Sequence, residues 1–441
     1  MHQVKYLIIG AGPSGLTLAH SLHDQGVPLA EILVLEKETI AGGLCRSEIV
    51  DGSPLDLGGG HFLDVKHQEV LDFIFRFLPE SEWNRHERIS KIHLRNQVVD
   101  HPLEANLWQF DTQTQVDYLE SIARAGCSQG TPIPESFAAW IRWKFGERIA
   151  DDYMLPYNHK IWEMDLDLLG TYWLYKLPNV SFRETLQSCL EGRPYGALPA
   201  HGIFLYPKQH GYGDVWKRMG DALGDSLMLD VSITDIDLES LTVNNRWRAQ
   251  HVFNSAPWHC WRSWTTLPGG IAEDIDHLHR VGIDIDYIPE TFGSPAHWIY
   301  EPDESLSHHR KLLRFNFCPE SRGYWTETNS LRSARGSGWR HTNPYAYPVN
   351  TIDKPVRIAR ILDWAGANRI TGFGRWGTWE HMNSDIAVKN AIALGKSFRR
   401  DKLSDDSPLV TLRKRRPASV PALHGRSHGG HSTQHSPVGA L

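Results

Sequence analysis

Apolar positions near the N-terminus switch between two periods. A short apolar run at 6–9 leads into a glycine-rich turn, apolar residues at helical spacing follow between Leu16 and Leu22, and a second apolar run occupies 32–35. Two strand-length runs on either side of a helix-length segment, within about 30 residues, are typical of a β-α-β unit. The pattern therefore predicts an α/β domain at the start of the chain.

The central part of the chain follows a helical pattern. Between residues 69 and 190, apolar residues recur three and four positions apart, as at Val70, Phe73 and Ile74, so this part is expected to be mostly helical. Shorter apolar runs return afterwards and predict strands, at 203–206, 251–253 and 312–315. Helical spacing then returns near 358–362 and again from about 385 to 398.

These changes of pattern divide the chain into six segments. We expect a Rossmann-like α/β domain in three pieces, with additional sheet in the second of them, at 1–68, 201–260 and 351–400. The two segments between the pieces predict a mainly helical insertion and an antiparallel sheet, at 69–200 and 261–350. The last segment, 401–441, is rich in Pro, Ser, His, Gly and Arg and has no periodicity. That composition predicts a disordered tail.

Composition excludes several classes of protein. A chain of 441 residues with 41% hydrophobic and 22% charged residues is ordinary for a globular protein of two or three domains. The net charge of −6 gives no general affinity for nucleic acid, so an anionic ligand needs a local basic site. No apolar run approaches the roughly 20 residues of a membrane span, and no signal-peptide pattern is present. We therefore expect no nucleic-acid partner, no membrane span and a cytoplasmic location, while the oligomeric state stays open.

The five cysteines are scattered along the chain. An odd number without regular spacing is typical of reduced thiols and of neither a disulfide framework nor a metal site. We therefore expect no bound metal.

The first glycine turn carries the clearest chemistry. Gly10-Ala-Gly12-Pro-Ser-Gly15 follows the first predicted strand and opens the first predicted helix. Glycines at this spacing let the backbone approach a pyrophosphate, and the helix N-terminus presents free N–H groups to it. Glu36 ends the second strand, where an acidic side chain accepts hydrogen bonds from ribose hydroxyls. The sequence therefore predicts a dinucleotide site.

A second motif favours FAD over a nicotinamide cofactor. The run from Glu36 continues through Gly42-Gly43-Leu-Cys-Arg46-Ser47. It resembles the second flavin motif of the amine oxidase and glutathione-reductase-like flavoproteins. The resemblance implies that the backbone at Gly43 passes close to FAD, and that Arg46 neutralises charge on the pyrophosphate or the flavin.

Two later segments resemble the same flavoproteins. His251-Val-Phe-Asn-Ser-Ala-Pro257 is similar to the strand and loop that return to the adenine side of the FAD domain. A glycine-rich turn followed by a helix resembles the C-terminal flavin motif, whose helix N-terminus points at the flavin; it contains Gly374, Arg375 and Asp385. A helix dipole there stabilises negative charge on a reduced flavin. The resemblance implies FAD as the cofactor and the three-piece domain as its binding domain.

The middle of the chain resembles a narrower group. Several short motifs, in order over about residues 1–398, are similar to those of UDP-galactopyranose mutases and of bacterial protoporphyrinogen oxidase-like flavoproteins. They are Leu57-Gly-Gly-Gly60-His61-Phe62, Phe145-Gly-Glu-Arg-Ile-Ala150, Leu155-Pro-Tyr-Asn158-His-Lys-Ile-Trp162, Tyr206-Pro-Lys-Gln-His-Gly211, Trp298-Ile-Tyr300 with Arg310, and Ala346-Tyr347-Pro348.

The resemblance implies a flavin-dependent isomerase. In such mutases, N5 of reduced FAD attacks the anomeric carbon of a nucleotide sugar and expels UDP, and the sugar ring then opens and recloses as a furanose with no net redox change. A nucleotide-sugar substrate like UDP-galactose, a flavin reductant and a role in polysaccharide synthesis would follow. The implied catalytic residues are His61 beside the flavin, Arg310 and Tyr347 on the diphosphate, and Asn158 and Trp162 around the sugar.

Four further residues are implied for the substrate. Trp298 and Tyr300 match the family pattern, whereas two others depart from it. His381 stands where the mutases carry a second tyrosine on the diphosphate. Lys176 stands near the position of their mobile substrate arginine, with Arg183 further along the chain. Lysine does not reproduce the bidentate fork of arginine, so the sugar or the reaction could differ.

Two other functions stay open. The first is an amine oxidase-like or protoporphyrinogen oxidase-like oxidoreductase, which would need an apolar pocket above N5 and no diphosphate site. The second is a flavin-binding protein without catalysis. Arg310 and Tyr347 discriminate between these functions. If both face the flavin cavity, an anionic substrate is favoured; if they lie outside an apolar cavity, an oxidase is favoured.

Overall fold

A parallel sheet forms around the N-terminal strand. In the computed structural model, which describes residues 1–174, 181–195, 202–334 and 338–398, strand β1 (His2–Ile9) lies between β2 (Ile32–Leu35) and β13 (Trp247–Asn254). Strand β10 (Leu227–Met228) extends the sheet beyond β2, and β19 (Ile370–Gly372) pairs with β13. All of these pairings are parallel. The three predicted pieces of the Rossmann-like domain thus contribute strands to one sheet.

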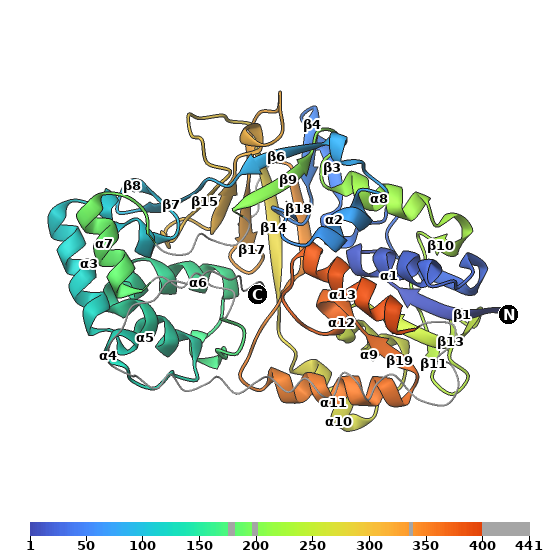
Figure 1. The fold of residues 1–441 in the computed structure, drawn as a ribbon. Helices are drawn as coiled ribbons and strands as arrows, with labels where there is room; N and C mark the ends of the chain where they lie inside the picture. The colour runs from blue at the N-terminus through green and yellow to red at the C-terminus, as the bar shows by residue number, and fades with distance from the viewer. Residues whose placement is uncertain (175–180, 196–201, 335–337, 399–441) are drawn as a thin grey trace, which may run out of the picture. The chain divides into compact units, whose positions relative to one another are not determined.

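Side chains alternate across β1, as the period of a strand requires. Tyr6 and Ile8 enter one hydrophobic cluster, and Leu7 and Ile9 enter a second on the other face. On the first face, α1 (Pro13–Asp24) packs against α13 (Ser384–Ser397) (Figure 1). The domain is completed by short strands and helices: α8 (Gly213–Asp221), β11 (Ile236–Asp237), β12 (Thr242–Val243), α9 (Trp261–Trp264), α10 (Gly269–Asp276), α11 (Lys354–Ala367) and α12 (Gly374–Gly377).

A second sheet of seven strands forms the other domain. Its order is β18-β14-β17-β16-β15-β7-β8, and every pairing is antiparallel except that of β15 with β7. The strands are β7 (Ser90–Leu94), β8 (Gln97–Asp100), β14 (Arg280–Ile288), β15 (Trp298–Tyr300), β16 (Arg310–Leu312), β17 (Tyr324–Asn329) and β18 (Arg340–Pro348). The predicted antiparallel sheet is therefore present.

Two details of the predicted elements were wrong. The segment 83–100, expected to be helical, forms strands β6 (Trp83–Glu87), β7 and β8. The strand predicted at 312–315 ends at Leu312, because the chain turns there into a short 3₁₀ helix (Arg314–Asn316). Strand β6 joins β5 (Leu63–Asp64) and β9 (Ile203–Pro207) in a three-stranded sheet.

The rest of the insertion is helical, as expected. It comprises α2 (Gln68–Ile74), α3 (Thr112–Arg124), α4 (Gly126–Gln129), α5 (Phe137–Ile149), α6 (Leu155–Trp162) and α7 (Phe182–Glu191). The side chains of Asp111, Ser136 and Ser181 cap the N-termini of α3, α5 and α7. Helix α3 packs against α5 and α7, and α6 packs against β17 of the second sheet. No helix among the described residues is both long and apolar enough to cross a membrane.

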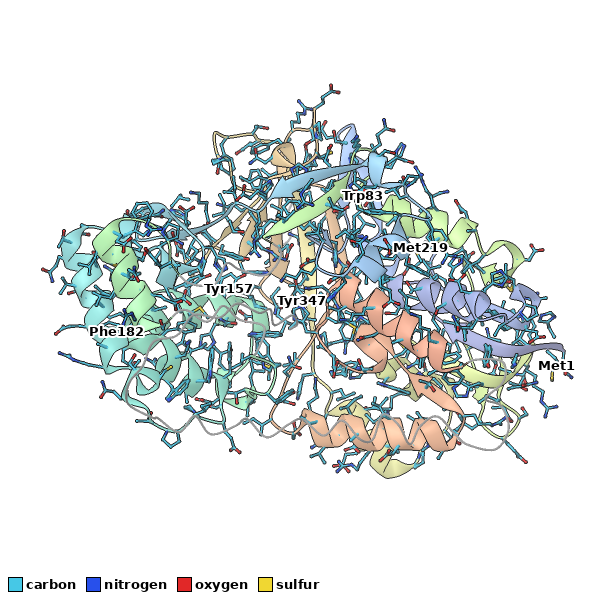
Figure 2. The ribbon with its side chains drawn as sticks, viewed as in Figure 1. Met1, Trp83, Tyr157, Phe182, Met219 and Tyr347 are labelled. Carbon is cyan, nitrogen blue, oxygen red and sulfur yellow. The ribbon has the colours of Figure 1, made fainter. Side chains whose placement is uncertain are left out.

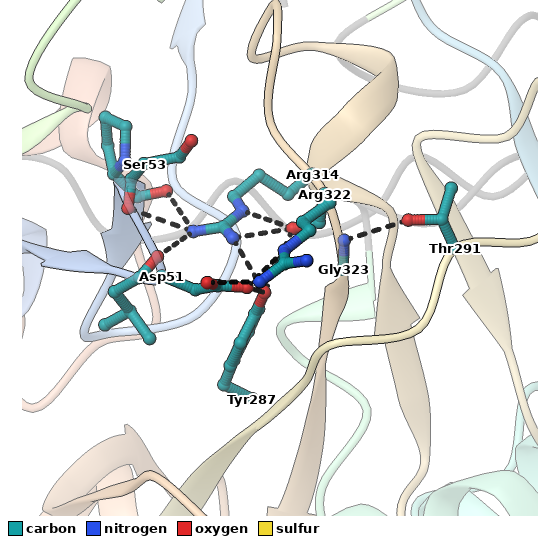
Figure 3. Close-up of polar contacts among 9 residues, drawn as sticks. Asp51, Ser53, Tyr287, Thr291, Arg314, Arg322 and Gly323 are labelled. Atoms are coloured by element: carbon teal, nitrogen blue, oxygen red, sulfur yellow. Dashed lines mark hydrogen bonds and ion pairs between the residues drawn. The ribbon is translucent and has the colours of Figure 1, made fainter.

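A buried arginine joins the first domain to the second sheet. The hairpin of β3 (Ser47–Val50) and β4 (Ser53–Asp56) follows the second glycine motif. Arg314 donates to the carbonyls of Val50 and Ser53 at 2.9 and 3.0 Å and to the hydroxyl of Tyr287 at 3.1 Å (Figure 3). Beside it, Arg322 forms an ion pair with Asp51 at 2.7 Å. These bonds hold the hairpin, and with it the loop at 57–62, against the second sheet.

Candidate functional site

The first glycine turn leaves no room for a side chain at Gly10 or Gly15. Gly10 has a φ of 97°, and a Cβ on Gly15 would lie 1.9 Å from the carbonyl oxygen of Gly10. The turn ends at Gly12, the N-cap of α1, and Pro13 occupies the first helical turn, where its missing N–H costs nothing. A Cβ on Gly43 would lie 3.1 Å from the Cα of Gly12, so the two glycine motifs are in direct contact.

Glu36 lies at the end of β2, as predicted. Its carboxylate accepts one hydrogen bond from the backbone N–H of Ala11 at 2.7 Å and another from that of Glu38 at 3.0 Å. The residue is 7% exposed and lines the cavity beside the glycine turn. The acidic side chain therefore also fixes the shape of the turn.

A cavity of about 450 Å³ lies beside the two glycine motifs. It is lined by six of the nine predicted cofactor residues, namely Gly10, Gly12, Glu36, Gly43, Arg46 and Arg375. The other three lie behind its wall: Gly15 packs on Gly10, Gly374 packs on Ser14, and Asp385 is buried in the first turn of α13. The N-terminus of α13 reaches the cavity through Asn383 and Ser384.

Two arginines on this cavity differ in their surroundings. Arg46 donates to the carbonyl of Gly43 at 2.9 Å and pairs with Glu38 at 3.1 Å. Arg375 instead donates to the carbonyls of Ala346 at 2.9 Å and Met382 at 2.6 Å. In the part of the chain that the structure describes, no carboxylate forms an ion pair with it. Burial lowers the pKa of Arg375, yet a guanidinium stays charged in proteins, so this site favours an anionic group.

A second cavity of about 440 Å³ adjoins the first and shares four lining residues with it: His61, Arg375, Asn383 and Ser384. Burial, together with the charge of nearby Arg375, lowers the pKa of His61 to about 4, so the imidazole is neutral at pH 7. Its ring is nearly parallel to that of Tyr212, with 6.5 Å between the ring centroids. His61 thus lies where the two cavities meet.

A third cavity of about 330 Å³ extends the second toward the helical insertion. The two share Arg88, Trp173, Tyr300, Arg310, Tyr347 and His381. Tyr157 on α6 and Tyr347 on β18, both labelled in Figure 2, contribute to it from the two sides.

All but one of the predicted catalytic and substrate residues line these two cavities. Trp298 lies in the second, Asn158 and Trp162 in the third, and Tyr300, Arg310, Tyr347 and His381 in both. Lys176 lies outside the described residues. Arg183 is exposed on α7 and lines neither cavity.

Glu327, the ion-pair partner of Arg310, was not predicted from the sequence. This carboxylate, less than 1% exposed, forms an ion pair with the guanidinium of Arg310 and accepts a hydrogen bond from the backbone N–H of Gly60 at 3.1 Å. Burial alone would raise the pKa of Glu327, but the charges and hydrogen bonds of Arg310 and His309 together outweigh it and lower the pKa to about 2. The Tyr347 hydroxyl lies 3.5 Å from the same guanidinium. Glu327 therefore connects the loop that carries His61 to the cation in the next cavity.

Hydrogen bonds orient several aromatic residues of the site. The Asn158 amide donates to the carbonyl of Met154 at 2.7 Å and accepts from the Trp162 indole at 3.1 Å. The Trp298 indole donates to the Tyr300 hydroxyl at 2.9 Å. Asn158 thus positions Trp162, and the two partners were predicted only as separate residues.

Arg88 is a second functional candidate that the sequence analysis missed. It donates to the Tyr300 hydroxyl at 2.8 Å and lies over the Trp298 ring, 4.5 Å from its centroid. Nothing in the sequence around β6 and β7 marks this arginine as part of the site, because its two partners there, Tyr300 and Trp298, come from a strand about 210 positions away.

Comparisons with known sequences match short segments of the chain. A family described as an NAD(P)-binding Rossmann-like domain matches residues 8–77. An uncharacterized protein in the nifH2 3′ region of Methanothermococcus thermolithotrophicus is 46% identical over 55 residues, 12% of this chain and 50% of its own length. Farnesylcysteine lyase of Arabidopsis thaliana is 36% identical over 74 residues, 16% of this chain and 15% of its own. This chain therefore spans half or less of these relatives.

Comparisons with solved structures cover nearly the whole described chain. A reduced UDP-galactopyranose mutase matches with a TM-score of 0.80 at 21% identity, over 89% of this chain and 93% of its own. A putative protoporphyrinogen oxidase from Exiguobacterium matches with a TM-score of 0.65 at 13% identity, over 90% and 98%. Cyclohexylamine oxidase from Brevibacterium oxydans gives 0.60 at 17% identity, over 90% and 100%.

These structural matches establish the fold. The chain has the architecture shared by UDP-galactopyranose mutase, protoporphyrinogen oxidase and amine oxidases, a Rossmann-like domain with an antiparallel second sheet, as the sequence motifs predicted. Since one fold serves isomerisation and oxidation alike, the choice of reaction depends on the cavities.

Proposed function

We propose that the protein is an FAD-dependent enzyme and that FAD binds in the first cavity. Two helix N-termini reach this cavity, that of α1 at Gly12 and that of α13 at Ser384, and helix N-termini favour anionic groups. Glu36 would bind the ribose, and Gly10, Gly12, Gly43 and Arg46 would surround the pyrophosphate. Arg375 and the start of α13 would face the flavin. The segments 1–68, 201–260 and 351–400 would then form the FAD domain.

The Glu36→Ala variant is expected to retain less FAD. It loses the proposed ribose contact and also the acceptor of the Ala11 N–H, a buried hydrogen bond of about 1 kcal/mol. The ratio of flavin to protein absorbance after purification measures occupancy. Glu48→Ala, on an exposed part of β3, serves as the control and should retain the cofactor. Equal occupancy in both variants would show that Glu36 does not contact the ribose.

We further propose that the enzyme is a mutase that interconverts pyranose and furanose forms of a nucleotide sugar. The observation that carries this proposal is the charge of the second cavity, whose described lining holds four cations and one carboxylate, Glu380; the cations are Arg88, Arg310, Lys354 and Arg375. If Glu327, the ion-pair partner of Arg310, is added to this count, the four cations still outnumber the two carboxylates. Arg310 and Tyr347 both line the second cavity, which adjoins the proposed FAD cavity. A diphosphate is the ligand class that such a lining favours.

The side chains of this site would have different roles in the reaction. Reduced FAD supplies a nucleophilic N5 for the anomeric carbon when it is bound, so a cellular flavin reductant would be required. Arg310 and Tyr347 would bind the departing diphosphate and stabilise its negative charge. Neutral His61 would lie beside the flavin. Asn158 would hold Trp162 against the sugar, with Trp298, Tyr300 and His381 around it.

One observation favours a second candidate, an oxidoreductase of the amine oxidase or protoporphyrinogen oxidase type. The third cavity has many aromatic walls, among them Phe137, Phe145, Tyr153 and Trp173. An apolar substrate could be enclosed there. This alternative leaves the cations of the second cavity without a role, and for that reason we place it second.

Turnover of UDP-galactofuranose tests the mutase directly. The purified yellow protein is incubated with millimolar substrate, with and without dithionite, and formation of UDP-galactopyranose is followed by chromatography. The expected result is conversion by the reduced protein alone, because only reduced flavin is nucleophilic at N5. No conversion, together with a flavin spectrum unchanged by millimolar UDP, would favour the oxidoreductase.

A further inference from the structure

The third cavity contains a carboxylate that the proposed mechanism does not use. Glu104 lies in the short 3₁₀ turn (Leu103–Ala105) after β8, is 8% exposed and lines the third cavity. The carboxylate accepts a hydrogen bond from its own backbone N–H and is near the charge of Lys144, while among the described residues no other side chain donates a hydrogen bond to it. Burial raises the pKa of Glu104 to about 6, so the group is mostly ionised above pH 7. The two carboxylate oxygens can accept further hydrogen bonds, and a ligand in the cavity could provide the donors.

Glu104 belongs to a separate part of the cavity. Arg88, Arg310 and Tyr347 also line the second cavity, whereas Glu104 and its aromatic neighbours line only the third. Those neighbours are Phe137, Phe145 and Tyr153. A ligand that occupies both cavities would therefore meet cations at one part and an aromatic-walled carboxylate at the other.

A nucleoside diphosphate has matching chemistry, with an anionic diphosphate and a planar base. The bases differ in the edge that they would present to a carboxylate. Guanine offers two adjacent N–H donors on its Watson–Crick edge, which a carboxylate accepts together. Uracil offers a single N–H between two carbonyl oxygens, and those oxygens would repel the carboxylate. Charge-assisted hydrogen bonds of this kind discriminate strongly, because the wrong base leaves the buried acceptor without its donors.

We propose that Glu104 reads the base of the substrate and that the site prefers a guanine nucleotide to a uracil nucleotide. This inference rests on the proposed nucleotide-sugar function and names the base for it. It identifies a specificity residue at the part of the cavity away from the flavin. UDP-galactofuranose would then be a usable but weak substrate.

Binding of free nucleotides to the oxidised holoprotein tests the inference. Titration with GDP, IDP and UDP is followed by the flavin spectrum and by calorimetry. We expect the Kd for GDP to be at least about tenfold below that for UDP, since each charged hydrogen bond contributes about a factor of ten or more. IDP, which lacks the exocyclic amine of guanine, should bind about tenfold more weakly than GDP for the same reason.

The Glu104→Gln variant provides the second comparison. It should reduce the GDP-to-UDP ratio to about threefold or less, because the amide presents one oxygen and one N–H donor group in place of two acceptor oxygens. Glu120→Gln, at an exposed position on α3, should leave the ratio unchanged. UDP binding as tight as GDP binding in the unmodified protein, or an unchanged ratio in Glu104→Gln, would overturn only the proposed role of Glu104 and not the proposed nucleotide-sugar function. Absence of binding by all three nucleotides would also overturn the proposed function.

Discussion

The Gly15→Ala variant is expected to lose bound FAD and to unfold at a lower denaturant concentration than the unmodified protein. A Cβ at this position would lie 1.9 Å from the carbonyl oxygen of Gly10, which is backbone and cannot rotate away. Helix α1 would have to move from the turn, and that movement would displace the N–H groups proposed to face the pyrophosphate. Overpacking of this kind costs about 1–3 kcal/mol, and backbone contacts belong at the upper end.

The measurements are flavin occupancy and the free energy of unfolding in urea. Gly270→Ala is a matched control, because Gly270 lies in helix α10 with nothing within 4 Å of its added Cβ. This substitution should leave the stability unchanged or raise it by up to about 1 kcal/mol, since alanine favours a helix over glycine. Full FAD occupancy in Gly15→Ala would mean that the turn has space that the structure does not show.

Local sequence patterns were sufficient to predict the Rossmann-like half of the fold. The apolar runs around β1 and β2 and the glycines between them are close in sequence, and each feature has one physical interpretation. The hairpin of β7 and β8 was missed although a local signal was present. Arg95 and Asn96 both adopt positive φ in its two-residue turn, and asparagine is common at such positions. The alternating residues of β7 were too few to outweigh the helical pattern around them.

The substrate side depends on contacts that local patterns do not reveal. Arg310, Tyr347 and Trp162 were proposed from motif resemblance, and the structure places all three on one cavity. Glu327 was missed because its role depends on pairing with Arg310 on a neighbouring strand and on the distant loop at Gly60. An acidic residue in the middle of an otherwise buried strand, as at 324–329, was the available signal, since buried carboxylates are rare unless paired.

The Arg310→Ala variant is expected to bind nucleoside diphosphate more weakly and to be less stable. Loss of a charged hydrogen bond to the diphosphate would cost about 1.5–3 kcal/mol of binding free energy, with FAD retained. The variant also leaves the Glu327 carboxylate buried without its cation, and breaking a buried ion pair from one side costs about 3–5 kcal/mol of stability. Calorimetric titration with nucleotide and urea unfolding measure the two effects separately.

The stability effect should depend on pH in a defined way. In the unmodified protein the pKa of Glu327 is lowered from 4.5 to about 2, so the pair stabilises the fold fully above pH 4.5. That contribution is lost progressively as the pH falls from 4.5 toward 2. In Arg310→Ala the main charge that lowers this pKa is gone and His309 remains, so the loss of stability on acidification should become smaller. Arg322→Ala, which removes an exposed ion pair with Asp51, is the control and should change stability by less than about 1 kcal/mol.

A double variant separates the two roles of Arg310. Replacing Arg310 with methionine and Glu327 with glutamine removes both charges, so most of the lost stability should return. Nucleotide affinity should stay low, because the guanidinium that would contact the diphosphate is still absent. If the double variant instead recovers both stability and nucleotide affinity, Arg310 acts only by neutralising Glu327, and the anion at this site must be bound by Arg88, Lys354 or Arg375. Retention of full affinity in Arg310→Ala would lead to the same reassignment.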